Sequence, residues 1–287
     1  MLRRPSVRLY AIVARAADVA VVFRRGPSKQ VQLLKWNLRT DEIEPGQWFK
    51  GRIEERWSDL SPDGKQLVYF ANKYKGDPAA WTAVSHPPYF TALALWPESQ
   101  LSYGGGEFLT NRDLLLHEHP CEVHPDFVAM MKHPKAVRIV GDKGAAALGH
   151  KAGNYGGWQT VQLEHNPSEE IKGWWRLLRW ILKSSKISHP KAWRKPQPGG
   201  DHVLITPDWM SWAHPGRILT ADGTILHHFD HADWFDWDHR GQLLYAAKGC
   251  LWRVADVADS KSEPKLVADL NANKFTEVVA PDWAKQW

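Results

Sequence analysis

WSDLSPDGKQLVYFA, which occupies residues 57–71, carries the clearest structural signal in the sequence. Its Pro62-Asp63-Gly64 segment is typical of a tight turn, because an Asp-Gly pair readily supplies the positive φ angles of a β-hairpin. The residues on both sides of the turn favour extended structure. The stretch therefore predicts a strand, a turn and a second strand.

A shorter copy of this pattern, WFDWDHRGQLLYAA, occupies residues 234–247. The matching positions are Trp57 and Trp234, Asp59 and Asp236, Gly64 and Gly241, and Tyr69 and Tyr245. A repeated strand–turn–strand unit indicates a repeat architecture.

The Ser61-Pro62-Asp63-Gly64-Lys65 turn resembles that of the TolB-type and WD-type β-propellers, whose blades often carry this turn between their first and second strands. The resemblance covers the two copies and identifies no particular family. It implies that residues 57–61 and 234–238 form equivalent innermost strands of two blades.

Other segments repeat the same rhythm of short strands and turns. Four successive antiparallel strands are expected at Arg8–Arg15, Val19–Arg24, Val31–Leu38 and Ile43–Phe49, and hairpins at 108–117 and 217–229. At about 40–50 residues per four-stranded blade, the chain holds about five or six blades. We expect an all-β protein in which residues 1–287 form one closed β-propeller, with its N-terminal strand beside strands near 265–279. The alternative is a β-sandwich with irregular insertions.

The composition excludes several classes of protein. The 287 residues are 43% hydrophobic, which is enough for a core and excludes intrinsic disorder, and 17 of them are Trp. A net charge of +5 is too small to argue for nucleic acid, and no apolar run approaches the roughly 20 residues of a membrane span. Cys121 and Cys250 are expected to be free thiols, and Arg8, Arg15 and Asp18 interrupt any signal-like segment, so a cytoplasmic location is expected.

No complete catalytic motif is present. The sequence lacks a Gly-x-Ser-x-Gly elbow, and the glycines at 104–106 and 141–157 lack phosphate-loop spacing, so we expect them in turns or flexible loops. These absences favour a non-enzymatic binding or scaffold module without a cofactor, which contacts another protein through its loops. Trp234 and Trp237 are candidate contact residues.

A metal-dependent propeller hydrolase or lactonase is the first alternative. Residues 227–239 contain four His and four Asp, and His231, Asp233 and His239 are the candidate ligands. We expect instead that the aspartates serve turns and that no structural metal is bound. The His117–His124 cluster lacks metal-site spacing and contains Pro120, so loop packing is expected there.

Binding of nucleic acid or of an anionic surface is the second alternative. Residues 171–198 hold eight Lys and Arg and no acidic residue. The segment is either a basic amphipathic helix anchored by Trp174, Trp175 and Leu178, or a strand over Trp174–Leu182 followed by a solvated loop. The candidate contacts are Arg176, Arg179, Lys183 and Lys186. Any of the eight that is buried would require an acid from elsewhere in the chain.

Overall fold

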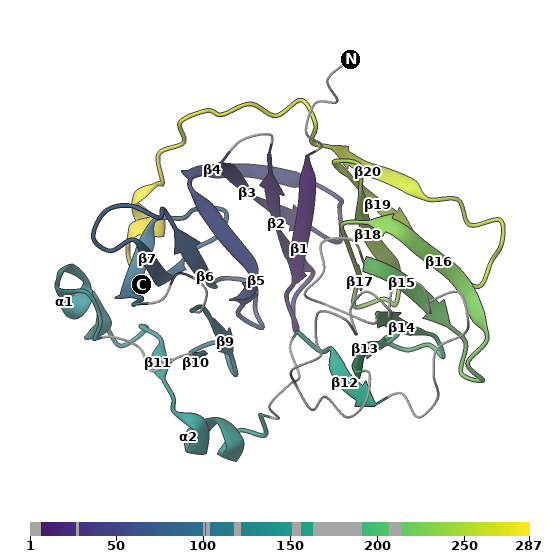
Figure 1. Cartoon of the computed structure of the whole chain (residues 1–287), viewed down its shortest axis with the longest axis horizontal. Coiled ribbons are helices and arrows are strands. Elements are labelled where there is room, and N and C mark those ends of the chain that lie inside the picture. Colours follow the sequence, from purple (N-terminus) through teal and green to yellow (C-terminus); the bar gives the residue numbers. More distant parts are fainter. Residues whose placement is uncertain are drawn as a thin grey trace, which may run out of the picture.

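The computed structural model describes residues 7–26, 29–99, 101, 104–117, 122–150, 156–162, 191–206 and 214–287. In these ranges the chain forms five β-sheets of three to five strands, which lie side by side around the centre of the molecule (Figure 1). The protein is therefore all-β and propeller-like, as the repeated hairpins predicted.

The first sheet is an antiparallel meander made entirely from the N-terminal segment. Its strands are β1 (Arg8–Val13), β2 (Val19–Arg25), β3 (Gln30–Asn37) and β4 (Ile43–Lys50). The four predicted strands are thus confirmed, with ends that differ by one or two residues.

The two sequence copies begin two further four-stranded sheets. One sheet contains β5 (Arg52–Leu60), β6 (Leu67–Asn72), β7 (Ala80–Ser85) and β8 (Ala92–Pro97), and the other contains β17 (Trp234–Trp237), β18 (Leu243–Ala247), β19 (Cys250–Val254) and β20 (Lys265–Asp269). Each copy supplies the first strand of its sheet, as predicted.

The turns of the two copies are also built alike. Ser61 Oγ accepts hydrogen bonds from the N–H groups of Lys65 (3.1 Å) and Gln66 (2.9 Å), and Gly64 adopts a φ of 72°. In the second copy, Asp238 Oδ1 accepts from the N–H groups of Arg240 and Gln242, both at 2.9 Å. A side-chain oxygen at the same position of the repeat therefore holds both turns.

The other two sheets depart from the expected four strands. The smaller contains β9 (Gly106–Phe108), β10 (Asp113–Leu116) and β11 (Arg138–Ile139), and the larger contains β12 (Gln159–Gln162), β13 (Lys191–Pro196), β14 (Val203–Thr206), β15 (His214–Leu219) and β16 (Ile225–Ala232). Both predicted hairpins, β9–β10 and β15–β16, are present. The third strand of the smaller sheet runs parallel to β10, where Arg138 Nε lies 2.8 Å from Asp113 Oδ1.

The expectation of a loop over Lys183–Pro198 is wrong for its described part. Residues Lys191–Pro196 form β13, which pairs with both β12 and β14. Pro196 is tolerated because it is the last residue of the strand, where one missing N–H interrupts little of the ladder. Residues 171–190 lie outside the described residues.

Helical structure is short in the described ranges. It consists of η1 (Pro125–Phe127), α1 (Val128–Met131), α2 (Asp142–Ala147) and η3 (Asp282–Lys285). None of these helices has the length and apolar character needed to span a bilayer.

Neighbouring sheets are joined by buried apolar clusters. Trp36 and Leu251 belong to a cluster between the first and last sheets, and Phe23 and Tyr69 to one between the first and second. Further clusters join β5–β8 to β9–β11, and β12–β16 to β17–β20. The order around the molecule is therefore β12–β16, β17–β20, β1–β4, β5–β8 and β9–β11.

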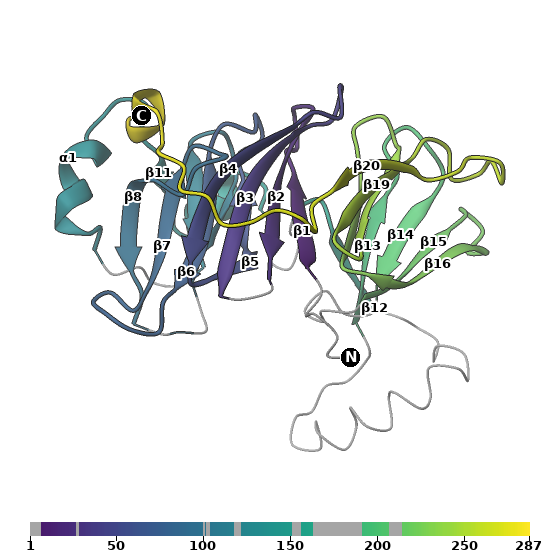
Figure 2. The same ribbon diagram turned by 90° about the horizontal axis from the view of Figure 1, so that it is seen from above.

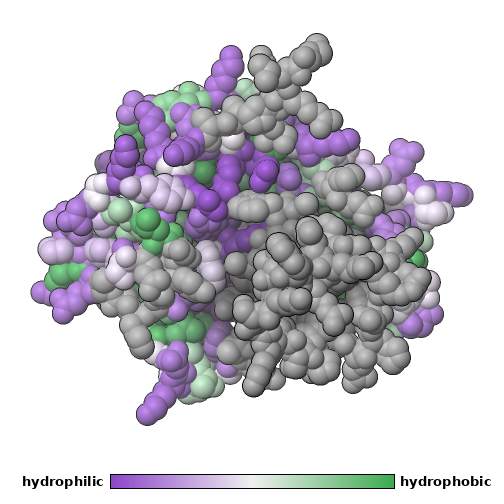
Figure 3. Space-filling view, viewed as in Figure 1, coloured by the Kyte–Doolittle hydropathy of each residue, from purple (hydrophilic) through white to green (hydrophobic). Residues whose placement is uncertain are grey.

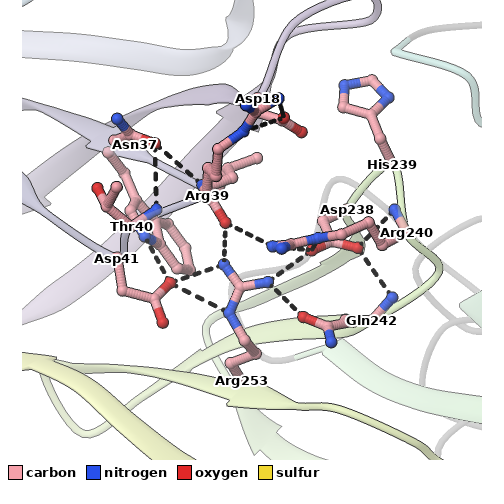
Figure 4. A network of polar contacts seen from close by, with 12 residues as sticks. Asp18, Asn37, Arg39, Thr40, Asp41, Asp238, His239, Arg240, Gln242 and Arg253 are labelled. Atoms are coloured by element: carbon pink, nitrogen blue, oxygen red, sulfur yellow. Dashed lines mark hydrogen bonds and ion pairs between the residues drawn. The ribbon is translucent and has the colours of Figure 1, made fainter.

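A polar network also joins the first and last sheets (Figure 4). Arg253 of β19 donates to Asp41 Oδ1 at 2.7 Å, to Asp238 Oδ2 at 2.5 Å and to the Leu38 carbonyl at 2.9 Å. Its side chain is 7% exposed and that of Asp238 is 1% exposed. The network ties the β3–β4 turn to the turn of the second sequence copy.

The C-terminal segment runs along the first sheet without pairing as a strand (Figure 2). Arg24 of β2 donates to the carbonyls of Leu270 and Asn271, Gln47 donates to the carbonyl of Val278, and a ring nitrogen of His86 lies 3.1 Å from the Gln286 carbonyl. The N-terminal strand lies beside the segment near 265–279, as expected: Leu9 and Ala11 of β1 share an apolar cluster with Leu270, against which Val267 and Ala268 of β20 pack. The two strands do not pair, because β1 belongs to the first sheet and β20 to the last.

Candidate functional site: a central cavity

All five sheets contribute to one cavity at the centre of the molecule. Its volume is about 870 Å³ including the open mouth. The lining residues come mainly from the first strands of the sheets, namely Tyr10–Val13, Arg56, Ser58, Asp59, Gly106, Glu107, His117, Gly156, Trp158, Trp193, Thr206 and Trp234–Asp236. A cavity assembled from separate sheets is a common place for a ligand in such folds.

Asp59 lies on β5 and forms an ion pair with Arg15, which follows β1 of the preceding sheet. Arg15 Nη1 lies 3.1 Å from Asp59 Oδ2, and the Phe108 N–H donates to the same oxygen at 2.8 Å. Burial raises the pKa of the Asp59 carboxyl, while Arg15 and the Phe108 N–H oppose the rise. The carboxylate thus links three sheets at the cavity wall.

Asp236 occupies the matching position of the second copy and has a matching partner. Lys195 Nζ, from β13 of the preceding sheet, lies 2.6 Å from Asp236 Oδ1, and both side chains are mostly buried. Burial raises the pKa of Asp236, and Lys195 opposes that rise. Lys195 belongs to the basic segment 171–198. Its mostly buried ammonium group pairs with Asp236 from another sheet, as expected for a buried charge.

Glu107 and His117 form a second polar group in the cavity. Burial raises the pKa of Glu107 to about 7 and lowers that of His117 to about 4, because it disfavours the charged form of each group. His150 Nδ1 lies 3.6 Å from Glu107 Oε2. His117 is therefore neutral near pH 7, whereas Glu107 changes charge there.

Aromatic rings form much of the remaining wall. Trp158 meets Phe235 edge-on, with ring centroids 5.8 Å apart, and Trp193 and Trp234 line the cavity from β13 and β17. Tyr10 lies beneath the Arg56 guanidinium, 5.5 Å from the ring centroid, and burial raises its pKa to about 12. The rings give the cavity a large apolar surface.

Two buried polar atoms of the wall lack a hydrogen-bond partner among the described residues. They are Thr206 Oγ1 and Glu107 Oε2. Thr206 is only 4% exposed. Buried polar atoms in proteins are nearly always hydrogen-bonded. A bound molecule or a water could therefore form hydrogen bonds with these two atoms.

The predicted contact residues fall in different places. Trp234 lines the cavity and is 5% exposed, whereas Trp237 is 2% exposed and donates its indole N–H to the Lys195 carbonyl at 3.2 Å, which makes it a core residue. The candidate contacts Arg176, Arg179, Lys183 and Lys186 lie outside the described residues.

The candidate metal ligands do not converge where they are described. Asp233 precedes β17 and His239 follows it, and the four-residue strand between them is about 13 Å long at 3.3 Å per residue. His239 Nε2 lies 2.8 Å and 3.0 Å from the carbonyls of Ala14 and Ala17, and donates to them. The backbone of His231 lies in β16, and its side chain is outside the described part. Within the described residues, no group of three or more His, Cys, Asp or Glu is arranged to hold a metal.

Sequence reasoning missed most of the cavity. Asp59 and Asp236 were matched as positions of the repeat, and an acid retained at the same place in both copies was the available signal. Glu107, Thr206 and Trp158 come from segments without a repeat, and their approach to one another depends on the packing of the sheets. Of the two cysteines, Cys250 is a free thiol and Cys121 lies outside the described residues.

Comparisons with known proteins identify no family. No family model matches the chain, and no curated protein matches it. Among solved structures, an uncharacterized protein from Listeria monocytogenes EGD-e aligns with 96% of this chain and 87% of its own, at 10% identity and a TM-score of 0.30. The β-propeller domain of the Trilobed protease from Pyrococcus furiosus, described as having an open velcro topology, aligns with 93% of this chain and 100% of its own, at 11% identity and a TM-score of 0.38.

Proposed function

We propose that the protein is a binding module that takes a small polar molecule into its central cavity. The observation that carries this proposal is that all five sheets line one cavity in which Thr206 Oγ1 and Glu107 Oε2 lack hydrogen-bond partners among the described residues. A ligand that supplies those hydrogen bonds removes the cost of leaving the two atoms desolvated. We further propose that the five sheets form one closed ring over residues 1–287, which the shared cavity supports.

A cavity-blocking variant tests the binding proposal. Ser58 lines the cavity, and Ser58→Phe places a ring in it. Ala258→Phe adds the same ring at an exposed position outside the cavity and is the matched control. The full chain is screened by ligand-observed NMR against sugars, amines, carboxylates and phosphates.

The expected result is that at least one class binds the wild-type protein and the Ala258→Phe variant but not the Ser58→Phe variant. If no class binds, or if binding survives Ser58→Phe in a folded protein, the cavity is not the binding site. Contact with a protein partner through the loops stays a separate prediction, since no described contact bears on it.

A further inference from the structure

The cavity has two unlike sides. The sheets β12–β16 and β17–β20 contribute Trp158, Trp193 and Trp234 along with the polar Thr206 and Asp236, whereas the lining residues of β5–β8 and β9–β11 include Asp59 and Glu107 and no tryptophan. These pairs of sheets lie on opposite sides of β1 in Figure 1. A ligand that fits this wall has an apolar face for the rings and polar groups on its edge.

The strongest charges of the wall are already paired within the protein. Arg15 forms an ion pair with Asp59, and Lys195 forms one with Asp236 at 2.6 Å. A charged ligand gains full electrostatic stabilisation only by breaking one of these pairs, and a buried pair that loses a partner is strongly destabilised. Among the described lining residues, the carboxyl without an Arg or Lys ion pair is Glu107, and burial disfavours its charged form. The cavity therefore favours an uncharged ligand.

The polar atoms that lack hydrogen-bond partners among the described residues are suited to bind hydroxyl groups of a ligand. Thr206 Oγ1 can donate one hydrogen bond and accept others, and a carboxyl oxygen such as Glu107 Oε2 accepts. A ligand hydroxyl both donates and accepts, so one kind of group satisfies both atoms. On the face seen in Figure 3, the described surface is mostly hydrophilic with small scattered apolar patches.

We propose that the cavity binds an uncharged carbohydrate, with the ring face against the tryptophans and hydroxyls on Thr206 and Glu107. The inference rests on the proposed function and narrows it to one ligand class. A sugar ring presents C–H groups on its face and hydroxyls around its edge, and the cavity offers tryptophan rings for the face and the polar atoms of Thr206 and Glu107 for the edge.

The test titrates the full chain with glucose, galactose, mannose and N-acetylglucosamine, and with maltotriose, cellotriose and chitotriose. Binding is followed by calorimetry and by tryptophan fluorescence, at low and at high salt. We expect binding of at least one of these sugars with little dependence on salt, because no charge is neutralised. Binding of a monosaccharide points to free sugars, and binding of trisaccharides alone points to glycan chains.

Matched variants locate the site. Thr206→Val removes the hydroxyl while keeping the shape of the side chain, and is expected to weaken binding about tenfold, as for the loss of one buried hydrogen bond. Trp158→Leu is expected to weaken it by a similar or larger factor. The controls are Ser85→Ala, which removes another buried hydroxyl without a partner among the described residues, and Trp283→Leu, an exposed tryptophan; both lie outside the cavity.

The outcomes separate this inference from the proposed function. If no sugar binds but an amine, carboxylate or phosphate is bound and blocked by Ser58→Phe, the carbohydrate inference is wrong and the cavity remains a binding site. If sugar binding is unchanged in folded Thr206→Val and Trp158→Leu variants, the carbohydrate inference is equally overturned.

Discussion

Burial raises the pKa of Glu107 to about 7, so this carboxyl changes charge near neutral pH. A raised pKa means that the folded protein binds the proton more tightly than the unfolded chain does. The stabilisation is fully present below the ordinary glutamate pKa of about 4.5 and is lost as the pH rises through about 7. His117 has the opposite effect, because its lowered pKa reduces stability as the pH falls below about 6.5.

Glu107→Gln isolates the first of these effects, since the amide cannot ionise. We expect the variant to gain about 2–3 kcal/mol of unfolding free energy relative to wild type between pH 5 and pH 8. Urea denaturation at several pH values measures the difference, and the contribution of His117 cancels in it. Glu263→Gln, an exposed carboxyl outside the cavity, is the control. A gap between Glu107→Gln and wild type that does not change with pH contradicts the prediction.

Gly105 shows how closely the sheets approach at the cavity. Its φ is 82°, and a Cβ atom there would lie 1.8 Å from the Trp57 carbonyl oxygen. Gly105, one of the glycines expected in turns or flexible loops, therefore lies where the backbones of β5 and β9 come close together. Gly76 has a similar φ of 90° but open space around it.

Comparison of Gly105→Ala with Gly76→Ala separates the two costs. Gly76→Ala is expected to lose about 1–2 kcal/mol, for the positive φ alone. Gly105→Ala is expected to lose about 2–5 kcal/mol, because the backbone of Trp57 must also move. Equal losses in thermal or urea unfolding would show that the close approach costs nothing.

At the scale of elements, one buried ion pair ties β13 to β17. Lys195→Met leaves Asp236 buried without its cation, and we expect a loss of about 3–5 kcal/mol. Adding Asp236→Asn to that variant should recover most of the loss. Lys285→Met removes an exposed pair with Asp282 and is expected to cost less than about 1 kcal/mol. The idea fails if Lys195→Met unfolds with the same midpoint as Lys285→Met.

The basic segment 171–198 gives a prediction of another kind. Replacing Arg176, Arg179, Lys183 and Lys186 by Gln is expected to leave the melting temperature nearly unchanged and to lower the salt concentration that elutes the protein from heparin. These four residues lie outside the described part of the chain. If the variant unfolds, or elutes at the same salt concentration as wild type, the segment is not a binding surface for anions.

At the scale of the whole molecule, each neighbouring pair of sheets joined by a cluster shares part of its core. Loss of one sheet exposes the apolar face of the next, and the C-terminal segment spans the first sheet to reach His86 beside β7. We therefore expect one cooperative unfolding transition. Far-UV circular dichroism and tryptophan fluorescence should give the same midpoint. Two separated midpoints would indicate two independent domains.

The sequence by itself determined the strands and turns of the repeat. Short-range chemistry specifies these features: the Asp-Gly turn at residues 63–64 depends on its own backbone angles, and short strand-like runs bounded by turn residues in 8–49 predict the meander. The roles of Ser61 and its counterpart Asp238 are also local, because each side chain accepts hydrogen bonds from backbone N–H groups within five residues.

Only the tertiary structure decided the cavity and the number of strands per sheet. Asp59 and Asp236 acquire their partners from the preceding sheets, and Glu107 lies near them because β9 packs beside β5. In 227–239 the packing acts the other way: Asp233 and His239, six positions apart in the sequence, are held at opposite ends of the strand β17. Spacing along the chain sets local geometry, whereas the meeting of side chains from five sheets depends on how their faces pack.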